Sequence, residues 1–171
     1  MPKKSLRIAV ASGKGGTGKT MVSTSLALAL ARRKRNTAME LPDASAGSLL
    51  FLDADVEAPN AHLFLTPIFE DRKEVGNLIP VIDESKCTFC GRCAEVCQYH
   101  AIAVVGKKTL VFPQLCHGCG SCTLNCPENA ITEKLHPIGF LERGMAAEGI
   151  SFARGIMNVG EPMAVPIIHQ L

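Results

Sequence analysis

The chain has 171 residues, of which 47% are hydrophobic and 20% charged, and its net charge at neutral pH is +2. This composition is that of a globular protein and excludes a disordered chain. No run of about 18 apolar residues occurs, and no small-residue cleavage site follows the basic first residues, so we expect a cytoplasmic protein without a membrane span. No basic stripe carries interleaved aromatic residues, and we expect no nucleic-acid partner.

The first part of the chain has the pattern of a βαβ unit. Residues 6–12 are mostly apolar and partly β-branched, which predicts a buried strand. After a glycine-rich stretch, a helix rich in alanine and leucine is expected from Thr20 to Ala31. Residues 49–52 predict a second buried strand. A strand, a helix and a strand of this length predict parallel pairing of the two strands.

A basic run and a loop are expected between this helix and the second strand. Residues 32–35 are Arg-Arg-Lys-Arg. A solvated helix end explains them better than a polyanion site, because cations are favoured at helix C-termini. Residues 36–47 contain turn residues and no periodicity, which predicts a loop.

The eight cysteines form two runs with the same spacing, C-x2-C-x2-C-x3-C: Cys87, Cys90, Cys93, Cys97, and Cys116, Cys119, Cys122, Cys126. Without an export signal, this number of cysteines indicates metal binding rather than disulfides. In two-cluster ferredoxins the fourth cysteine of each run ligates the other cluster. We therefore expect two [4Fe-4S] clusters with crossed ligand sets: Cys87, Cys90, Cys93 and Cys126 for one, and Cys116, Cys119, Cys122 and Cys97 for the other.

Zinc is the alternative for these cysteines. Its sites more often use paired C-x2-C units that close on one metal, and a duplicated run of four fits that pattern poorly. Between the runs, residues 101–105 and 109–112 predict a β-hairpin. Pro127 follows Cys126, as the ferredoxin pattern expects, whereas Gln98 follows Cys97.

A phosphate-binding motif, G-x4-G-K-T, lies between the first expected strand and the helix: Gly13, Lys14, Gly15, Gly16, Thr17, Gly18, Lys19 and Thr20. In such a loop the backbone N–H groups converge on phosphate oxygens, and the helix N-terminus adds positive charge. Lys19 would reach the β- and γ-phosphates of ATP, and the Thr20 hydroxyl would bind Mg²⁺. A glycine-rich turn without a chemical role is the alternative, and the position between strand and helix argues against it.

The loop has a lysine, Lys14, in addition to the Lys19 of the general motif. The resulting pattern K-G-G-x-G-K-T resembles the deviant phosphate loop of the MinD/ParA/Mrp family of P-loop ATPases. The resemblance implies that Lys14 reaches across a nucleotide-sandwiched dimer to the partner's phosphates. Residues 52–60 resemble the family's switch I, which implies that Asp55 orients the attacking water and that Asp53 lies near Mg²⁺. A polar strand end is the alternative for these two aspartates.

One branch of this family carries an inserted two-cluster ferredoxin domain after switch I, and this chain has the same order. The predicted fold is therefore α/β, with part of the parallel sheet of a P-loop NTPase and an inserted α+β module like a bacterial ferredoxin. We expect residues 1–82 to be the N-terminal part of the nucleotide-binding domain, 83–135 the insert, and 136–171 the return to that domain.

The chain departs from the family after the cysteine module. Family members continue with further strands and a switch II aspartate, whereas no aspartate follows Asp83 here. Two parallel strands and one helix cannot cover both faces of a sheet. Either the tail completes a reduced sheet or the domain is truncated. Lys14 and Asp55 are the residues expected to act in hydrolysis. The missing switch II aspartate weakens the prediction of hydrolysis more than it weakens the prediction of nucleotide binding.

The predicted function is that of an ATP-binding iron–sulfur protein that couples nucleotide binding to electron transfer or to cluster handling. Its partners would be a redox protein or an Fe–S client, and the resemblance implies a nucleotide-dependent homodimer. The alternative is a ferredoxin-like electron carrier with a vestigial, inactive ATPase portion. A MinD-like positioning protein would need a C-terminal amphipathic helix, for which residues 165–171 are too few.

Overall fold

The computed structural model describes residues 6–40 and 48–171. Its elements in chain order are α1 (Lys19–Glu40), β1 (Leu50–Asp53), α2 (His62–Leu65), β2 (Ile68–Ile82), α3 (Arg92–Glu95), β3 (Ile102–Val105), β4 (Lys108–Val111), η1 (Pro113–Leu115), α4 (Ser121–Leu124), β5 (Ile131–Ala146), η2 (Ala147–Gly149), β6 (Ile150–Met157) and α5 (Val165–Gln170). The chain divides into two compact units. Residues up to 72 together with 142–155 form the first unit, and residues 73–141 together with 156–171 form the second.

The larger sheet has the strand order β1-β6-β5-β2. β1 pairs in parallel with β6, so that Leu50 lies opposite Ser151 and Asp53 opposite Arg154. β5 and β6 are joined by the three residues of η2, a connection short enough only for antiparallel neighbours. The sheet is therefore mixed: the α/β class is confirmed, whereas the predicted parallel pairing holds for β1 with β6 and not for β6 with β5. Residues 136–171 supply β6 and most of β5.

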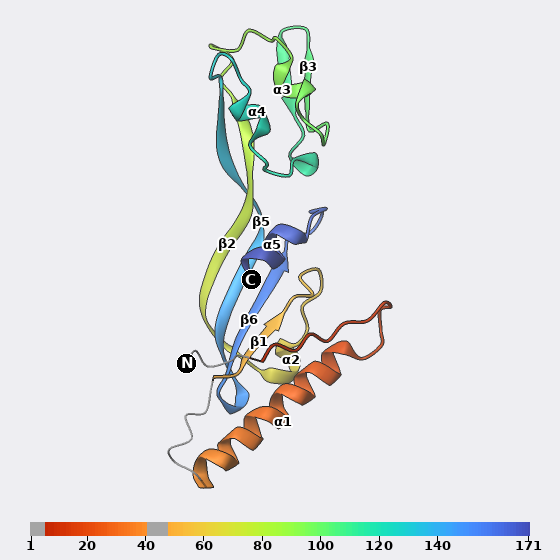
Figure 1. Ribbon diagram of the computed structural model, residues 1–171, viewed down its shortest axis with the longest axis vertical. Helices are drawn as coiled ribbons and strands as arrows, with labels where there is room; N and C mark the ends of the chain where they lie inside the picture. Colours follow the sequence, from red (N-terminus) through yellow and green to blue (C-terminus); the bar gives the residue numbers. More distant parts are fainter. Residues whose placement is uncertain (1–5, 41–47) are drawn as a thin grey trace. The chain divides into compact units, whose positions relative to one another are not determined.

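The core of the first unit lies between α1 and the strands, where Figure 1 shows α1 beside β1 and β6. Ala27 and Ala31 of α1 are buried in one cluster with Ile150 and Phe152 of β6. The Phe152 ring stacks on that of Phe51, with ring centroids 5.7 Å apart. This packing fixes α1, and with it the phosphate loop at its N-terminus, against the strand that ends at Asp53.

Helix α1 is longer than the sequence indicates. The basic run lies inside the helix, which continues to Glu40, so the prediction that the run ends the helix is wrong. Arg32 and Arg35 both pair with Glu148 in η2. Since α1 ends at Glu40, the predicted loop is wrong for residues 36–40, and residues 41–47 lie outside the described part of the chain.

The predicted strand at residues 6–12 is also wrong. These residues have no strand conformation, and Leu6 and Ile8 are 85% and 56% exposed. An apolar, β-branched segment becomes a strand only where a neighbouring strand completes its hydrogen bonds and a face is buried. β1 takes β6 as its parallel neighbour instead, so the expected pairing of residues 6–12 with β1 is absent from the structure as described.

In the second unit, β3 and β4 form an antiparallel hairpin in which Ile102 lies opposite Val111. This confirms the predicted hairpin. Ile102 packs with Cys93 and Ile131, and this small cluster is the hydrophobic core of the cysteine-rich region. The short helices α3 and α4 each begin after a glycine of one cysteine run, Gly91 and Gly120.

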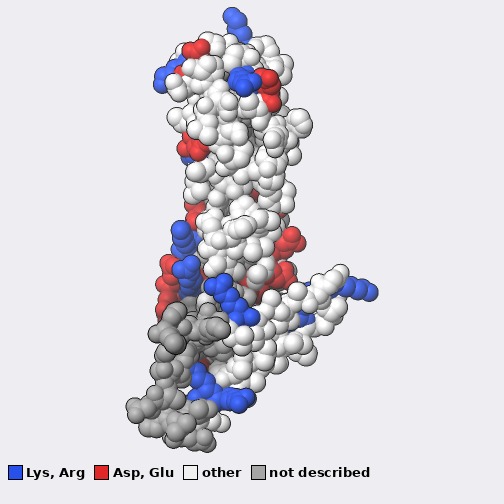
Figure 2. Space-filling model, viewed as in Figure 1, with Lys and Arg blue, Asp and Glu red and all other residues white. Residues whose placement is uncertain are grey.

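Acidic and basic side chains are interspersed on the face seen in Figure 2. Within residues 6–40 and 48–171, none of the helices combines the length and apolar character that a bilayer crossing requires.

Candidate functional site

The phosphate loop precedes α1 in the first unit and is exposed from Gly13 to Gly18. Gly16 and Gly18 have φ of 72° and 87°, a left-handed conformation that glycine adopts at little cost. The Val22 N–H donates to the Gly18 carbonyl at 2.9 Å, which closes the first turn of α1. The motif therefore has the form of an open loop at a helix N-terminus, where an anion such as phosphate is favoured.

Ser12, which the sequence analysis did not single out, joins several parts of this loop. Its hydroxyl donates to the Lys14 carbonyl at 2.7 Å and accepts from the Thr17 hydroxyl at 2.9 Å and from the Lys19 ammonium at 3.2 Å. These bonds hold the Lys19 side chain over the loop. Ser12 was counted as the last residue of a strand, and nothing in the motif marks it as a loop residue.

The switch-like segment after β1 contacts the phosphate loop. The Thr20 hydroxyl donates to the side-chain oxygen of Asn60 at 2.9 Å. Asp53 is buried, and its carboxylate accepts from the Ala61 N–H at 3.0 Å and from the Asp55 N–H at 3.3 Å. Asp53 thus holds the backbone of the segment, while Asp55 is exposed. Asn60 had no predicted role, because an asparagine without a motif position gives no signal in one sequence.

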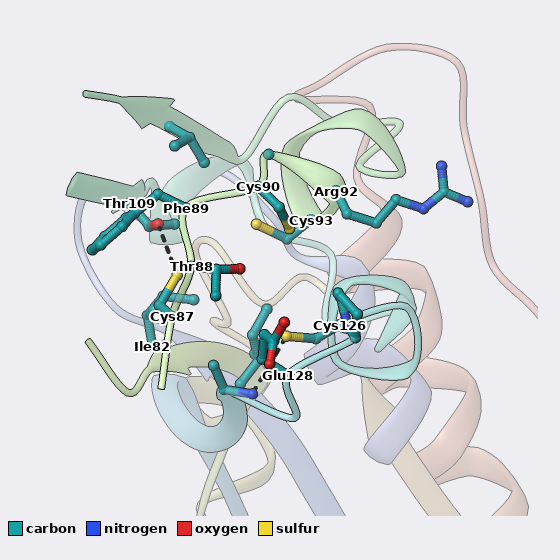
Figure 3. A pocket seen from close by; sticks show the side chains of 15 residues that line it. Ile82, Cys87, Thr88, Phe89, Cys90, Arg92, Cys93, Thr109, Cys126 and Glu128 are labelled. Atoms are coloured by element: carbon teal, nitrogen blue, oxygen red, sulfur yellow. Dashed lines mark hydrogen bonds between the residues drawn. The ribbon is translucent and has the colours of Figure 1, made fainter. Parts of the chain in front are cut away.

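The cysteines of the second unit line two cavities, and Figure 3 shows one of them. The cavity in Figure 3 is lined by Cys87, Cys90, Cys93 and Cys126, and the other by Cys97, Cys116, Cys119 and Cys122. Each set takes three cysteines from one run and the fourth from the other run. The cavities are similar in size, about 340 and 370 Å³ with the space open to solvent included. Four thiols around each of two similar cavities fit a pair of identical cubane clusters. We refer to them as the first and second cavities.

The two cysteine runs share their backbone conformation. Phe89 and Gly118 hold equivalent places and have φ of 56° and 67°. His100 and Asn129, which follow the last cysteine of each run, have φ of 52° and 49°. A positive φ is uncommon for residues other than glycine, so its recurrence at matching places shows that both runs fold around their cavities in the same way.

Hydrogen bonds to sulfur also recur in the two runs. The Ala101 N–H donates to Cys97 Sγ and the Ala130 N–H to Cys126 Sγ, both at 3.3 Å. Backbone N–H groups aimed at cysteine sulfur are among the features that set the potential of an iron–sulfur cluster. The fourth cysteine of each run therefore has the hydrogen bond that a cluster ligand would use.

Burial raises the pKa of the Cys93, Cys116 and Cys122 thiols. Hydrogen bonds from Ser121 lower the pKa of Cys119. Because metal ligands are thiolates, cluster binding would displace protons from the buried thiols. Among the described residues, no group of three or more His, Cys, Asp or Glu side chains is placed to hold a single metal ion.

Two protein families match the sequence of this chain. The ParA family, described as the NUBPL iron-transfer P-loop NTPase, matches residues 4–82. The 4Fe-4S dicluster domain matches residues 79–136.

Similar proteins are found in Methanocaldococcus jannaschii. The chain is 33% identical to the uncharacterized protein MJ0578 over 97% of this chain and 53% of that protein. It is 32% identical to the uncharacterized protein MJ0579 over 95% of this chain and 54% of that protein. The uncharacterized ferredoxin MJ0722 is 36% identical over 32% of this chain and 77% of the ferredoxin. The chain thus spans about half the length of the first two relatives.

An open phosphate loop and two four-cysteine cavities define an iron–sulfur, nucleotide-binding class of protein. Within that class, residues 4–82 match the ParA-type P-loop NTPase family, and the chain carries a ferredoxin-type 4Fe-4S dicluster domain. The resemblance to the MinD/ParA/Mrp family is confirmed.

Proposed function

We propose that this protein binds MgATP in the phosphate loop and thereby controls electron transfer through two resident [4Fe-4S] clusters. Lys19 contacts the β- and γ-phosphates, and the Thr20 hydroxyl binds Mg²⁺. Lys14 contacts the phosphates of a second copy in a nucleotide-dependent dimer, and Asp55 orients water where hydrolysis occurs. One cluster is held by Cys87, Cys90, Cys93 and Cys126, and the other by Cys97, Cys116, Cys119 and Cys122.

The contact between Thr20 and Asn60 carries this proposal. The Thr20 hydroxyl donates to Asn60, and a magnesium ion bound to that hydroxyl would alter this hydrogen bond. Nucleotide binding would thereby change the contacts of the segment from Asp53 to Ala61. That segment continues through α2 into β2, the strand that precedes Cys87. The phosphate loop is thus linked to the segment by a hydrogen bond, and the segment is linked to the first cysteine run by the continuous chain of α2 and β2.

We also propose that the cysteine module, residues 83–135, is an insert in the nucleotide-binding domain. The first unit supports this because it is formed from residues on both sides of the module. The electron acceptor would be a redox protein of the cytoplasm. Cys97 and Cys126 accept backbone hydrogen bonds at sulfur. Such bonds strengthen the binding of a metal centre, which supports clusters that stay bound over clusters that are delivered to a client.

The test uses the full chain purified without oxygen. About eight irons per chain and matching labile sulfide are expected from two cubanes. Calorimetry would measure MgATP affinity, and redox titration with and without MgATP would measure the midpoint potentials. A nucleotide-dependent shift that Lys19→Ala abolishes would support coupling.

Two other outcomes would contradict the coupling proposal. Intact clusters without nucleotide affinity would establish the alternative function, a ferredoxin-like carrier with an inactive nucleotide-binding portion. Transfer of clusters to an apo-ferredoxin on addition of MgATP would establish cluster handling instead of electron transfer.

A further inference from the structure

The two cysteine runs give the cavities matching backbone surroundings. The Asp83 N–H donates to the Ala130 carbonyl and the Phe112 N–H to the Ala101 carbonyl, both at 2.8 Å. Each of these bonds joins the segment before one run to the residue four positions after the last cysteine of the other run. Residues at equal distances from the cysteines of the two runs therefore hold equivalent places and can be compared.

Four of these equivalent places differ in chemistry. Beside the second cavity they hold aromatic or apolar residues, all exposed: Phe112, Leu115, His117 and Tyr99. Beside the first cavity they hold polar residues, three of them charged: Asp83, Lys86, Thr88 and Glu128. We call these sets the second face and the first face. The duplicated module thus has a mostly apolar surface at one cavity where the other cavity has a polar one.

Two rings of the second face extend from the cavity to solvent. The Tyr99 and His117 rings stack, with centroids 3.7 Å apart and planes 12° apart. Both residues line the second cavity and both are exposed. The Leu115 N–H donates to the Phe112 carbonyl at 3.1 Å, so the same short turn that carries these two residues leads into the stacked rings.

The first face has polar contacts of its own. Lys86 pairs with Asp83 at 3.3 Å. Thr88 and Glu128 line the first cavity at the places that the two stacked rings hold at the second. Charged and hydroxyl groups lose hydration when a partner covers them, so this face is better suited to remain in water.

Two equivalent places have their apolar side chain at the first cavity instead. Phe89 corresponds to Gly118, and Pro127 to Gln98. Phe89 is half-buried, and proline is small, so these two residues expose less apolar surface than the four residues of the second face. Glu133 adds a polar group at the second cavity, where it accepts from the Thr123 hydroxyl at 2.9 Å. An apolar surface with a polar neighbour is the usual anatomy of a protein interface.

The area of the second face limits what can cover it. Tyr99 and Phe112 are each 41% exposed, and Leu115 is 49% exposed. Because a large aromatic side chain buries about 150–250 Å² in full, the face offers about 300 Å² of apolar surface. A stable dimer needs about 800 Å² from each partner, whereas weak electron-transfer encounters bury less. The area therefore favours a transient redox partner over a permanent second copy of the chain.

The chemistry of the second face also restricts the partner. None of its four residues is Lys, Arg, Asp or Glu. A charged group of a partner would lose its hydration against this face and gain no opposite charge in return. A complementary surface is therefore apolar and uncharged.

We propose that the second face is the docking surface for an electron-transfer protein with an uncharged, apolar face around its own redox centre. The partner docks against the Tyr99 and His117 rings, which border the second cavity, and this contact brings its redox centre close to the cluster. One electron leaves the reduced cluster, which is oxidised, and reduces the partner's centre, and no bond or proton is exchanged. This inference rests on the proposed clusters.

The test uses the full chain, purified without oxygen and reduced, together with oxidised azurin, a blue-copper protein with an uncharged, apolar face over its copper. Stopped-flow absorbance measures the reduction of Cu(II) to Cu(I). Leu115→Lys gives the second face the ammonium group that Lys86 supplies on the first, and the rate should fall by about tenfold or more. In the unaltered chain the rate should change by less than about twofold with ionic strength, because no charge pair guides the encounter.

Docking is measured separately, without electron flow. The oxidised chain is added to isotope-labelled Cu(I) azurin, and chemical-shift changes on azurin give the Kd. Leu115→Lys should raise this Kd by about tenfold or more. Leu115 does not line either cavity, so the iron and sulfide content should be unchanged. If that content falls, Phe112→Asp, also outside both cavities, is the second variant.

Lys86→Ala, at the equivalent place of the first face, is the matched control and should change neither the rate nor the Kd. Ferricyanide, a small acceptor that needs no docking face, should oxidise the clusters of all these chains at the same rate.

The inference and the proposed function fail in different ways. With intact clusters, azurin that stays oxidised, or a rate and Kd unaffected by Leu115→Lys, would overturn the inference alone. A loss of rate in Lys86→Ala would do the same, and so would a stable dimer in sedimentation that Leu115→Lys dissociates. A chain that binds no iron and sulfide would overturn the proposed function.

Discussion

Lys14 and Lys19 belong to one loop but are expected to act on different phosphates. Lys19→Ala removes the ammonium that Ser12 holds over the loop, so MgATP affinity should fall by about tenfold or more. Lys14→Ala should leave affinity in the monomer unchanged and weaken nucleotide-dependent dimerisation. Calorimetry and analytical ultracentrifugation would measure the two effects, with Lys107→Ala in the exposed β3–β4 turn as the control. Equal loss of affinity in both variants would show that Lys14 acts within its own chain.

Asp53 and Asp55 offer a second comparison between neighbouring residues. Asp53→Asn replaces a buried carboxylate that accepts two backbone N–H groups by an amide with one acceptor oxygen. The loss should lower the free energy of unfolding by about 1–3 kcal/mol. Asp55→Asn, at an exposed position, should leave stability unchanged. Chemical denaturation would measure both, and equal stability of the two variants would contradict a structural role for Asp53.

The crossed cysteine sets predict which cluster each single substitution damages. Cys97→Ala removes a thiol from the cavity of Cys116, Cys119 and Cys122, so the cluster there should be lost or converted while the other stays intact. Cys126→Ala should have the reverse effect. Mössbauer and paramagnetic resonance spectra would tell the two clusters apart. Loss of the cluster that belongs to the mutated run would show that each run acts independently.

Among the site residues, those with a motif position could be predicted from sequence and those without one could not. The grouping of the cysteines around two cavities was expected, because in two-cluster ferredoxins with this spacing the fourth cysteine of each run ligates the other cluster. Ser12 and Asn60 were missed. Each acts through a contact that depends on how distant segments pack, and such contacts leave no periodic or spaced pattern in a single sequence.

At the scale of elements, strands with clear apolar runs were predicted and charged or interrupted strands were not. The strand at 49–52 and the hairpin of β3 and β4 were expected. β2 was missed because its first half, Ile68 to Glu74, is largely charged and exposed, without the alternation of a half-buried strand. β5 was missed because Pro137 and two glycines interrupt its pattern. Residues 6–12 show the opposite error, since an apolar run alone does not supply a pairing partner.

The glycines of β5 are explained by close backbone approach. A Cβ added to Gly144 would collide with the backbone of Ile68 and Phe69 in β2. Gly144→Ala should therefore force the strands apart and cost about 2 kcal/mol or more of stability. Gly15→Ala, at a position with open space and no positive φ, is the control and should leave the thermal midpoint unchanged. An unchanged midpoint in both variants would show that the sheet absorbs the extra methyl group.

For the molecule as a whole, the crossing of the two cysteine runs has a topological consequence. A cluster bound to Cys93 and Cys126 closes a long loop of chain, and a cluster bound to Cys97 and Cys116 closes a shorter loop nested inside it. Like covalent crosslinks, such closures restrict the unfolded chain, and one crosslink over a loop of this kind contributes about 3–4 kcal/mol. The two clusters would therefore act as nested crosslinks in a region with little hydrophobic core.

Chelation of the iron should speed hydrogen exchange throughout residues 83–135 while leaving α1 and β1 as protected as before. Unaltered exchange in residues 83–135 after complete iron removal would show that this region stays folded without the clusters.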